Sequence, residues 1–69
     1  MLNGKKLEQI RQALGLTRKE LADGLGVDYG TVHNWEQKDE ALKNYVAFSI
    51  QGMFPDRVII RDDTFFVSV

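Results

Sequence analysis

The spacing of the hydrophobic residues changes at Pro55, the only proline of the chain. Before Pro55, hydrophobic residues recur three or four positions apart, which is the period of one face of a helix. After it, β-branched and aromatic residues flank Asp62-Asp63 with a period of two, which is typical of a hairpin. The sequence therefore predicts a single, mainly α-helical domain over 1–69, with helices in 1–53 and a β-hairpin in 57–69.

Capping residues and glycines divide the helical part into four short helices. Asn3 is a suitable N-cap for the first, and Gly15 is expected to end it. Thr17 and Glu20 have the spacing of a capping box, which predicts a second helix over about 17–24. The inner faces of these two helices are Leu7, Ile10 and Leu14, and Leu21, Ala22 and Leu25.

Two further helices are expected after the turn at Gly26. Asp28 is predicted to cap the third helix, and Asp39 is predicted to start the fourth. Gly52 and Pro55 are expected to end the fourth helix. The inner positions are Val32 and Trp35 on the third helix, and Leu42, Tyr45, Val46 and Ile50 on the fourth.

The hairpin has hydrophobic residues on both of its faces. A turn at 62–63 pairs Val58 with Val67 and Ile60 with Phe65 on one side. Ile59 and Phe66 then share the opposite side, and covering the helices with the first side leaves these two residues unexplained.

The composition excludes several classes of protein. With no cysteine, the chain has no disulfide, cysteine-based metal site or thiol chemistry. No hydrophobic run approaches the roughly 18 residues of a membrane span, and the N-terminus is charged where a signal peptide would be apolar. Nine basic and ten acidic residues leave nucleic-acid binding open, because that depends on where the charges lie. We expect a cytoplasmic protein with no cofactor, no metal and no membrane contact.

Residues 16–36, LTRKELADGLGVDYGTVHNWE, carry the most information about function. They predict two short helices joined by a glycine turn, a helix-turn-helix. The segment resembles the helix-turn-helix of Cro and the lambda-repressor-like DNA-binding proteins, over roughly residues 5–50 of this chain. The matching residues are Leu16, Thr17, Glu20-Leu21-Ala22, Gly26-Val27, Thr31-Val32 and Trp35-Glu36, with Ile10-Arg11, Leu14 and Gly15 upstream.

The chain departs from the family pattern at three points. Lys38 replaces a common glycine, and four helices rather than five are expected. Gly30 occupies a position where family members often have a base-contacting side chain. The C-terminal hairpin is closer to Cro-type proteins, which end in β structure and pair through it.

The resemblance implies that residues 28–37 form the recognition helix in the major groove of double-stranded operator DNA. Asn34 has the amide that pairs with adenine, Tyr29 can contact a thymine methyl or a phosphate, and Arg18 can contact a phosphate. The candidate DNA contacts are Thr17, Arg18, Lys19, Tyr29, Gly30, Thr31, His33, Asn34, Gln37 and Lys38.

Each of these candidates has a structural alternative. Asn34 and His33 can be uncommitted surface side chains, Tyr29 can pack on the first helix, and Thr31 can assist the helix cap. Arg18 can form an exposed charge pair of little value. For Arg11 and Glu36 the structural role is preferred, because the resemblance implies an ion pair between the first and third helices.

A homodimer is expected, because one helix-turn-helix reads few base pairs and a two-fold dimer reads two half-sites. Ile59 and Phe66, with Val67 and Val69 on the last strand, are the predicted interface, since free apolar strand edges invite pairing. The alternative is that Ile59 or Phe66 packs on the fourth helix and the dimer forms elsewhere, for instance through Tyr45, Phe48 and Phe54.

The sequence thus predicts a transcriptional regulator, a repressor or autorepressor that binds a palindromic operator. By analogy, its small size suits a phage, another mobile element or an anti-CRISPR-associated operon. Its place would be the bacterial or phage-infected cytoplasm, on the nucleoid. The alternative is a protein-interaction module, antitoxin- or inhibitor-like, which the slightly acidic balance favours. An enzyme is a remote third hypothesis.

Overall fold

The computed structural model describes residues 2–61 and 64–68, and within them it has four helices and one antiparallel hairpin. This confirms the predicted fold class. Asp62-Asp63, the predicted turn, and Val69 lie outside the described residues. The elements are α1 (Gly4–Ala13), α2 (Arg18–Leu25), α3 (Tyr29–Lys38), α4 (Asn44–Met53), β1 (Val58–Arg61) and β2 (Thr64–Val67).

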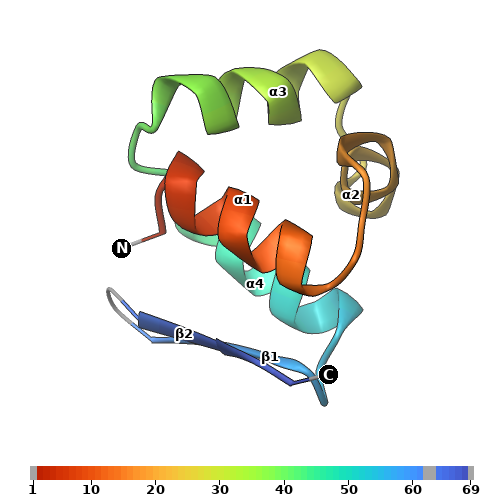
Figure 1. Ribbon diagram of the computed structural model, residues 1–69, viewed down its shortest axis with the longest axis vertical. Helices are drawn as coiled ribbons and strands as arrows, with labels where there is room; N and C mark the ends of the chain where they lie inside the picture. Colours follow the sequence, from red (N-terminus) through yellow and green to blue (C-terminus); the bar gives the residue numbers. More distant parts are fainter. Residues whose placement is uncertain (1, 62–63, 69) are drawn as a thin grey trace.

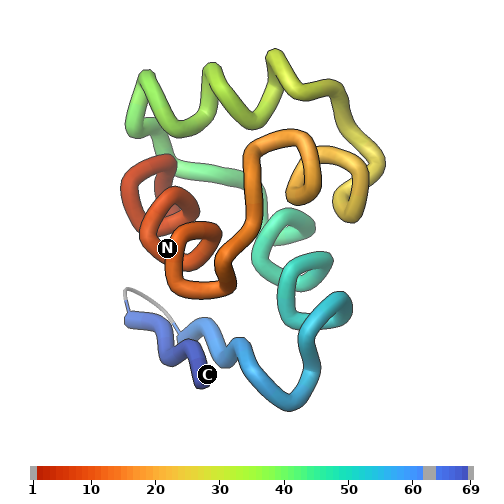
Figure 2. Tube along the Cα trace, turned by 45° about the vertical axis from the view of Figure 1, so that its right-hand side comes forward, coloured from red at the N-terminus to blue at the C-terminus, as the bar shows by residue number. Residues whose placement is uncertain are grey.

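The elements form three layers. Helix α3 packs on α1 and α2 at one end of the molecule, and the hairpin packs at the other end, β1 on α4 and β2 on α1. Helices α1 and α4 lie between them, and a second view shows the same order (Figure 1, Figure 2). The outer face of α3 and the outer face of the hairpin therefore point in opposite directions.

The start of α1 and the glycine turns follow the sequence expectations. Asn3 Oδ1 accepts a hydrogen bond from Lys6 N at 2.9 Å, and Gly15 adopts a left-handed φ of 74° after the helix. Gly26 also has a left-handed φ, 73°, between α2 and α3. The two helices of the helix-turn-helix are thus separated by a backbone conformation that glycine adopts without strain.

The predicted capping box of α2 is confirmed. Glu20 N donates to Thr17 Oγ1 at 3.1 Å, and Thr17 N donates to Glu20 Oε1 at 2.8 Å.

The prediction that Asp39 starts the fourth helix is wrong. Asp39 ends α3 with a left-handed φ of 51°, and its Oδ1 accepts a hydrogen bond from Lys5 N at 2.8 Å. The chain then runs extended beside the N-terminus, where Leu42 N donates to Leu2 O at 2.8 Å. Helix α4 starts only at Asn44, because residues 40–43 make these non-local contacts instead of a helical turn.

Three smaller expectations also need correction. Asp28 lies at the N-cap of α3 but makes no side-chain capping hydrogen bond. Tyr45, expected on the inner face of α4, is 52% exposed. Gly52 lies inside α4 rather than after it, so the helix ends at Met53.

Gly4 brings the start of α1 against the backbone at the end of α3. A Cβ atom at this position would overlap the carbonyl oxygen of Trp35 and would lie 3.0 Å from Asp39 Cα. The residue is buried, and its own amide donates to Glu40 O at 3.1 Å. Only glycine allows this contact, which ties the far end of α3 to α1.

The hairpin has the predicted register, with Val58 opposite Val67, Ile59 opposite Phe66 and Ile60 opposite Phe65. The inner residues join the core, whereas Ile59 and Phe66 are 47% and 65% exposed. The buried core residues of the described chain are Leu2, Leu7, Ile10, Leu14, Leu21, Ala22, Val32, Leu42, Val46, Ile50 and Val58. No helix of the described chain is long and apolar enough to cross a membrane.

Candidate nucleic-acid interface

Helix α3 has one face in the core and one face in solvent. Val32 and Glu36 are buried, and Trp35 is half-buried against the core cluster. On the other side Thr31 and His33 are half-buried. The exposed candidates on this helix are Tyr29, Gly30, Asn34, Gln37 and Lys38. None of the seven α3 candidates is fully buried, but only five of them are exposed.

The candidates at the start of α2 lie beside α3 but do not share one environment. Thr17 and Lys19 are exposed, and Lys19 Nζ pairs with Asp23 Oδ2 at 3.1 Å between two largely exposed side chains. Arg18 is half-buried, because its guanidinium turns toward α3 and α1.

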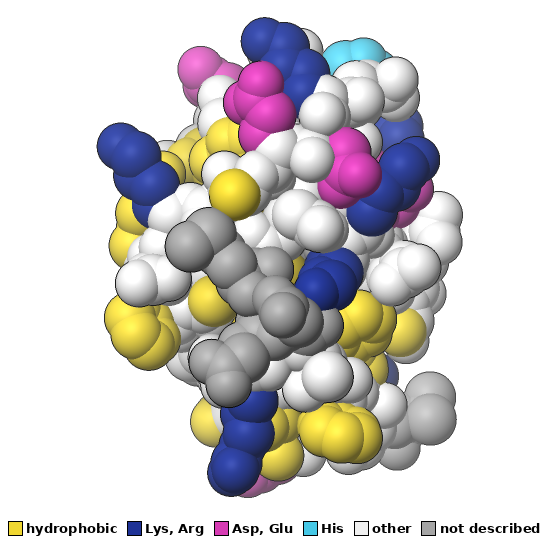
Figure 3. Space-filling view, turned by 90° about the vertical axis from the view of Figure 1, so that its left-hand side faces the viewer, with side chains coloured by type: hydrophobic (Ala, Val, Ile, Leu, Met, Phe, Trp, Pro, Cys, Tyr) yellow, Lys and Arg dark blue, Asp and Glu magenta, His cyan; other side chains and the backbone are white. Residues whose placement is uncertain are grey.

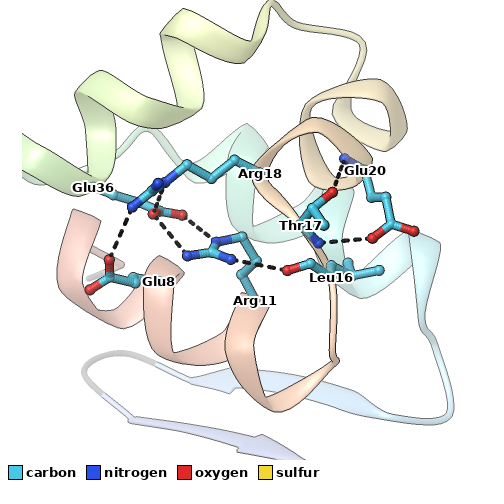
Figure 4. A network of polar contacts seen from close by, with 7 residues as sticks. All are labelled: Glu8, Arg11, Leu16, Thr17, Arg18, Glu20 and Glu36. Carbon is cyan, nitrogen blue, oxygen red and sulfur yellow. Dashed lines mark hydrogen bonds and ion pairs between the residues drawn. The ribbon is translucent and has the colours of Figure 1, made fainter.

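A buried carboxylate joins three helices behind the exposed face of α3 (Figure 4). The Glu36 side chain has no exposed surface. Arg11 donates to it from Nε to Oε2 at 2.8 Å and from Nη2 to Oε1 at 3.2 Å. Arg11 Nη1 also donates to Leu16 O at 3.0 Å. Arg11 on α1 thus holds both α3 and the entry to α2.

Arg18 completes this cluster. Its Nε donates to Glu36 Oε1 at 2.8 Å, and its Nη2 lies 3.6 Å from Glu8 Oε2. Two arginines and two glutamates therefore balance in charge, and both helices of the motif are tied to α1 through one carboxylate.

The sequence interpretation contained the Arg11–Glu36 pair but missed the contacts of Arg18 and Glu8. One signal was available for Glu8, since its spacing of three places it beside Arg11 on α1. No signal in a single sequence shows that Arg18, at the start of another helix, turns inward.

A model of a family described as helix-turn-helix matches residues 7–46, more than half of the chain. The chain belongs to this Cro/CI-type helix-turn-helix family. It is a DNA-binding transcription regulator in the general sense of that family. A comparison with curated proteins finds no match. The matched residues contain α1 from Leu7 onward, α2, α3 and the start of α4, but not the hairpin.

The ionisation of Glu36 follows from its neighbours. Burial alone would raise the pKa of this carboxyl, but hydrogen bonds from Arg11 and Arg18 outweigh burial and lower the pKa below its ordinary value. The hydrogen bond to Glu36, and then that to Tyr29, raise the pKa of Arg18. Glu36 therefore remains ionised at neutral pH, between the two arginines that hold it.

The outer face of α3 also carries a stacked pair of rings. Tyr29 and His33 have nearly parallel rings, with 14° between their planes and 6.1 Å between their centroids. Tyr29 is 52% exposed. Within the described residues no group of three or more histidine and acidic side chains could hold a metal ion.

Proposed function

We propose that the protein is a sequence-specific repressor that binds a palindromic operator as a homodimer. The observation that carries this proposal is the exposed face of α3, held from behind by the buried Glu36 cluster. In a helix-turn-helix such a face enters the major groove. The protein bound at a promoter would then block RNA polymerase. This would take place in the cytoplasm of a bacterium that carries the operator, either in its own genome or in that of a phage.

The roles divide between specificity and positioning. Asn34 is exposed at the centre of the face, and its amide can pair with the edge of an adenine. Thr17 and Lys19 lie at the exposed start of α2, where they would contact phosphates. Arg18 has N–H groups beyond those used by Glu36 and Glu8, so it can bridge the cluster to a phosphate.

Binding-site selection from random duplex DNA, followed by mobility shift over a salt series, tests this proposal. Asn34→Ala should lose about 1–3 kcal/mol on the selected site and relax preference at one base pair. Lys19→Ala is the matched control, since it should weaken all sequences alike and reduce the salt slope by about one. Equal weakening of random DNA by Asn34→Ala would contradict the assignment, and no selected site at all would favour the protein-interaction alternative.

The homodimer proposal rests on the difference between the two hairpin edges. The outer edge of β1 is occupied, because Ile60 N donates to Gln51 Oε1 at 3.1 Å and Val58 N donates to Phe54 O at 3.0 Å. Ser68 N donates to Arg57 O at 2.7 Å, so the alternation of an antiparallel ladder turns the amides of Phe65 and Val67 outward. In the described chain the edge of β2 is thus the free one, and free edges pair.

The layers of the fold favour pairing through this edge rather than through the outer face of the sheet. Two sheets packed face to face would place the two α3 helices at opposite ends of the dimer (Figure 1). Edge-to-edge pairing places the two-fold axis perpendicular to the sheet, and both α3 helices then point to the same side. Val67 would lie at such a joint, and Phe66 and Ile59 would extend its apolar outer face. Val69, the fourth residue of the predicted interface, lies outside the described residues.

Exposed hydrophobic side chains occur near the hairpin and on α4, and Figure 3 shows hydrophobic surface in the lower half of one view. Substitutions distinguish a dimer that forms through the hairpin from one that forms through α4. Phe66→Lys and Ile59→Lys should give folded monomers by sedimentation at micromolar concentration, with weakened operator binding, because they add like charges beside the joint. Phe48→Lys, at a residue that is 70% exposed on α4, should remain dimeric. The reverse pattern would assign the dimer to α4.

A further inference from the structure

His33 contains an unexplained polar atom. Among the side chains of residues 2–61 and 64–68, its Nδ1 is the one nitrogen or oxygen that is buried without a hydrogen-bond partner. The residue as a whole is only half-buried, and Nε2 is not among the buried unpartnered atoms. The ring therefore turns Nδ1 toward the protein and leaves Nε2 as the nitrogen that an outside group can reach.

The orientation of this ring is fixed by its neighbours. The Tyr29 ring stacks on it from one turn earlier, and Tyr29 lies close enough to Arg18 to raise the pKa of that guanidinium. Arg18 in turn donates to the buried Glu36 carboxylate at 2.8 Å. A continuous set of contacts thus runs from the core to the imidazole, which is the arrangement that holds a recognition side chain in one geometry before its ligand arrives.

The buried nitrogen also selects the tautomer. A neutral imidazole has one N–H donor and one bare acceptor nitrogen. Buried backbone N–H groups without an acceptor are rare in proteins, and under-satisfied backbone carbonyl oxygens are somewhat less rare. We apply the same order to the two nitrogens of the imidazole. The proton therefore belongs on Nε2, which makes the accessible nitrogen of His33 a hydrogen-bond donor.

We propose that His33 determines specificity by donating from Nε2 to the major-groove edge of a guanine. Guanine presents two adjacent acceptors, N7 and O6, whereas thymine presents one acceptor, O4, beside a methyl group. Adenine places a donor beside N7, and cytosine presents a donor. Asn34, the next residue, has the amide suited to adenine. The inference rests on the proposed DNA-binding face of α3 and deepens it, by naming the atom, its protonation and the base.

Gly30 leaves room for this contact. It lies one turn before His33 and Asn34, and a Cβ atom there would meet nothing in the fold within 4 Å. Glycine inside a helix is less favourable than alanine. Since the fold does not require glycine at this position, its missing side chain is explained by the close approach of the duplex to the helix.

Paired substitutions of His33 test the proposal on the duplex selected from random DNA. The amide nitrogen of glutamine can occupy the position of Nε2, whereas the asparagine amide occupies that of Nδ1. We expect His33→Ala and His33→Asn to lose roughly threefold to tenfold in affinity for the selected duplex, and His33→Gln to retain most of it. Replacing the contacted guanine with 7-deazaguanine should weaken the wild type by a similar factor and His33→Ala no further.

Several outcomes would overturn the inference. Equal affinities of His33→Gln and His33→Asn for the selected duplex would show that Nε2 is not the contacting atom. If His33→Ala lost as much affinity for random DNA as for the selected duplex, His33 would be a phosphate contact. Unchanged binding by His33→Ala, with Asn34→Ala still defective, would refute the inference and leave the proposed function standing. A wild-type protein that shows no sequence preference at all would instead refute the proposed function. Thermal melts of each variant distinguish a loss of folding from the loss of the DNA contact.

Discussion

Removing Arg11 tests how much of the fold depends on the buried Glu36 carboxylate. Arg11→Ala deletes two hydrogen bonds to Glu36 and one to Leu16 O. Breaking a buried ion pair costs about 3–5 kcal/mol when the remaining charge has no partner. Arg18 still donates to Oε1 at 2.8 Å, so we expect a smaller loss of about 2–3 kcal/mol.

This loss is large for a domain of 69 residues, whose unfolding free energy is expected to be about 3–10 kcal/mol. It corresponds to a decrease of about 8–24 °C in the melting temperature. Urea denaturation followed by circular dichroism at pH 7 measures it directly. Arg18→Ala alone should cost less than Arg11→Ala, because its side chain is 29% exposed and Arg11 remains on both oxygens.

The double variant is decisive, because only the loss of both arginines leaves the carboxylate buried without a partner. It should lose more than the sum of the single variants, by about 0.5–3 kcal/mol. If the double variant does not fold, adding Glu36→Met should restore folding, since a hydrophobic residue of similar volume removes the unpaired charge. Additive single effects, or a loss below about 0.5 kcal/mol for Arg11→Ala, would refute the reasoning.

The remaining predictions concern pH, close packing and capping. The folded pKa of Glu36 lies below the unfolded value of about 4.3, so its stabilisation is present above that pH and is lost as the pH falls through the folded pKa. Urea denaturation at pH 7 and pH 3 should therefore show a steeper acid loss for the wild type than for Glu36→Gln, and parallel curves would contradict this. Gly4→Ala should lower stability by about 1–3 kcal/mol or more, because the new Cβ meets the backbone of Trp35, whereas Gly30→Ala should be neutral or stabilising. Equal melting temperatures for Gly4→Ala and Gly30→Ala would disprove the close contact between Gly4 and the backbone of Trp35. Thr17→Ala should cost about 0.5–2 kcal/mol through the capping box, and a melting temperature equal to that of the wild type would argue against it.

Features that depend on local sequence were predictable. The period of hydrophobic residues, Asn3, the Thr17 capping box and Gly15 each act within one turn, so they indicate helices without knowledge of the rest. The hairpin register followed from the alternation together with the expected position of the turn at 62–63. The family pattern also predicted that the second and third helices together form a helix-turn-helix.

Features that depend on distant neighbours were not predictable. Asp39 is of a residue type that is typical of N-caps. However, residues 40–43 contact the N-terminal part of the chain, so the helix starts only at Asn44. Gly4 looks like an ordinary first-turn residue, and only the folded chain shows the Trp35 backbone above it. The inward turn of Arg18 likewise requires the position of Glu36 on another helix.

The two faces of α3 differ in their surroundings, and this difference separates substitutions that act on stability from those that would act on the proposed DNA contact. Val32 and Glu36 attach the helix to α1 and α2, and their environment is closed to solvent. Asn34 is exposed and His33 is half-buried on the same ten-residue helix, where His33 stacks on Tyr29. If the exposed face binds DNA as proposed, substitutions at Asn34 should change recognition with little cost in stability, whereas substitutions at Val32 or Glu36 should change stability first. The orientation of the exposed face still depends on the cluster, because Glu36 lies on the same helix and is held by Arg11 and Arg18.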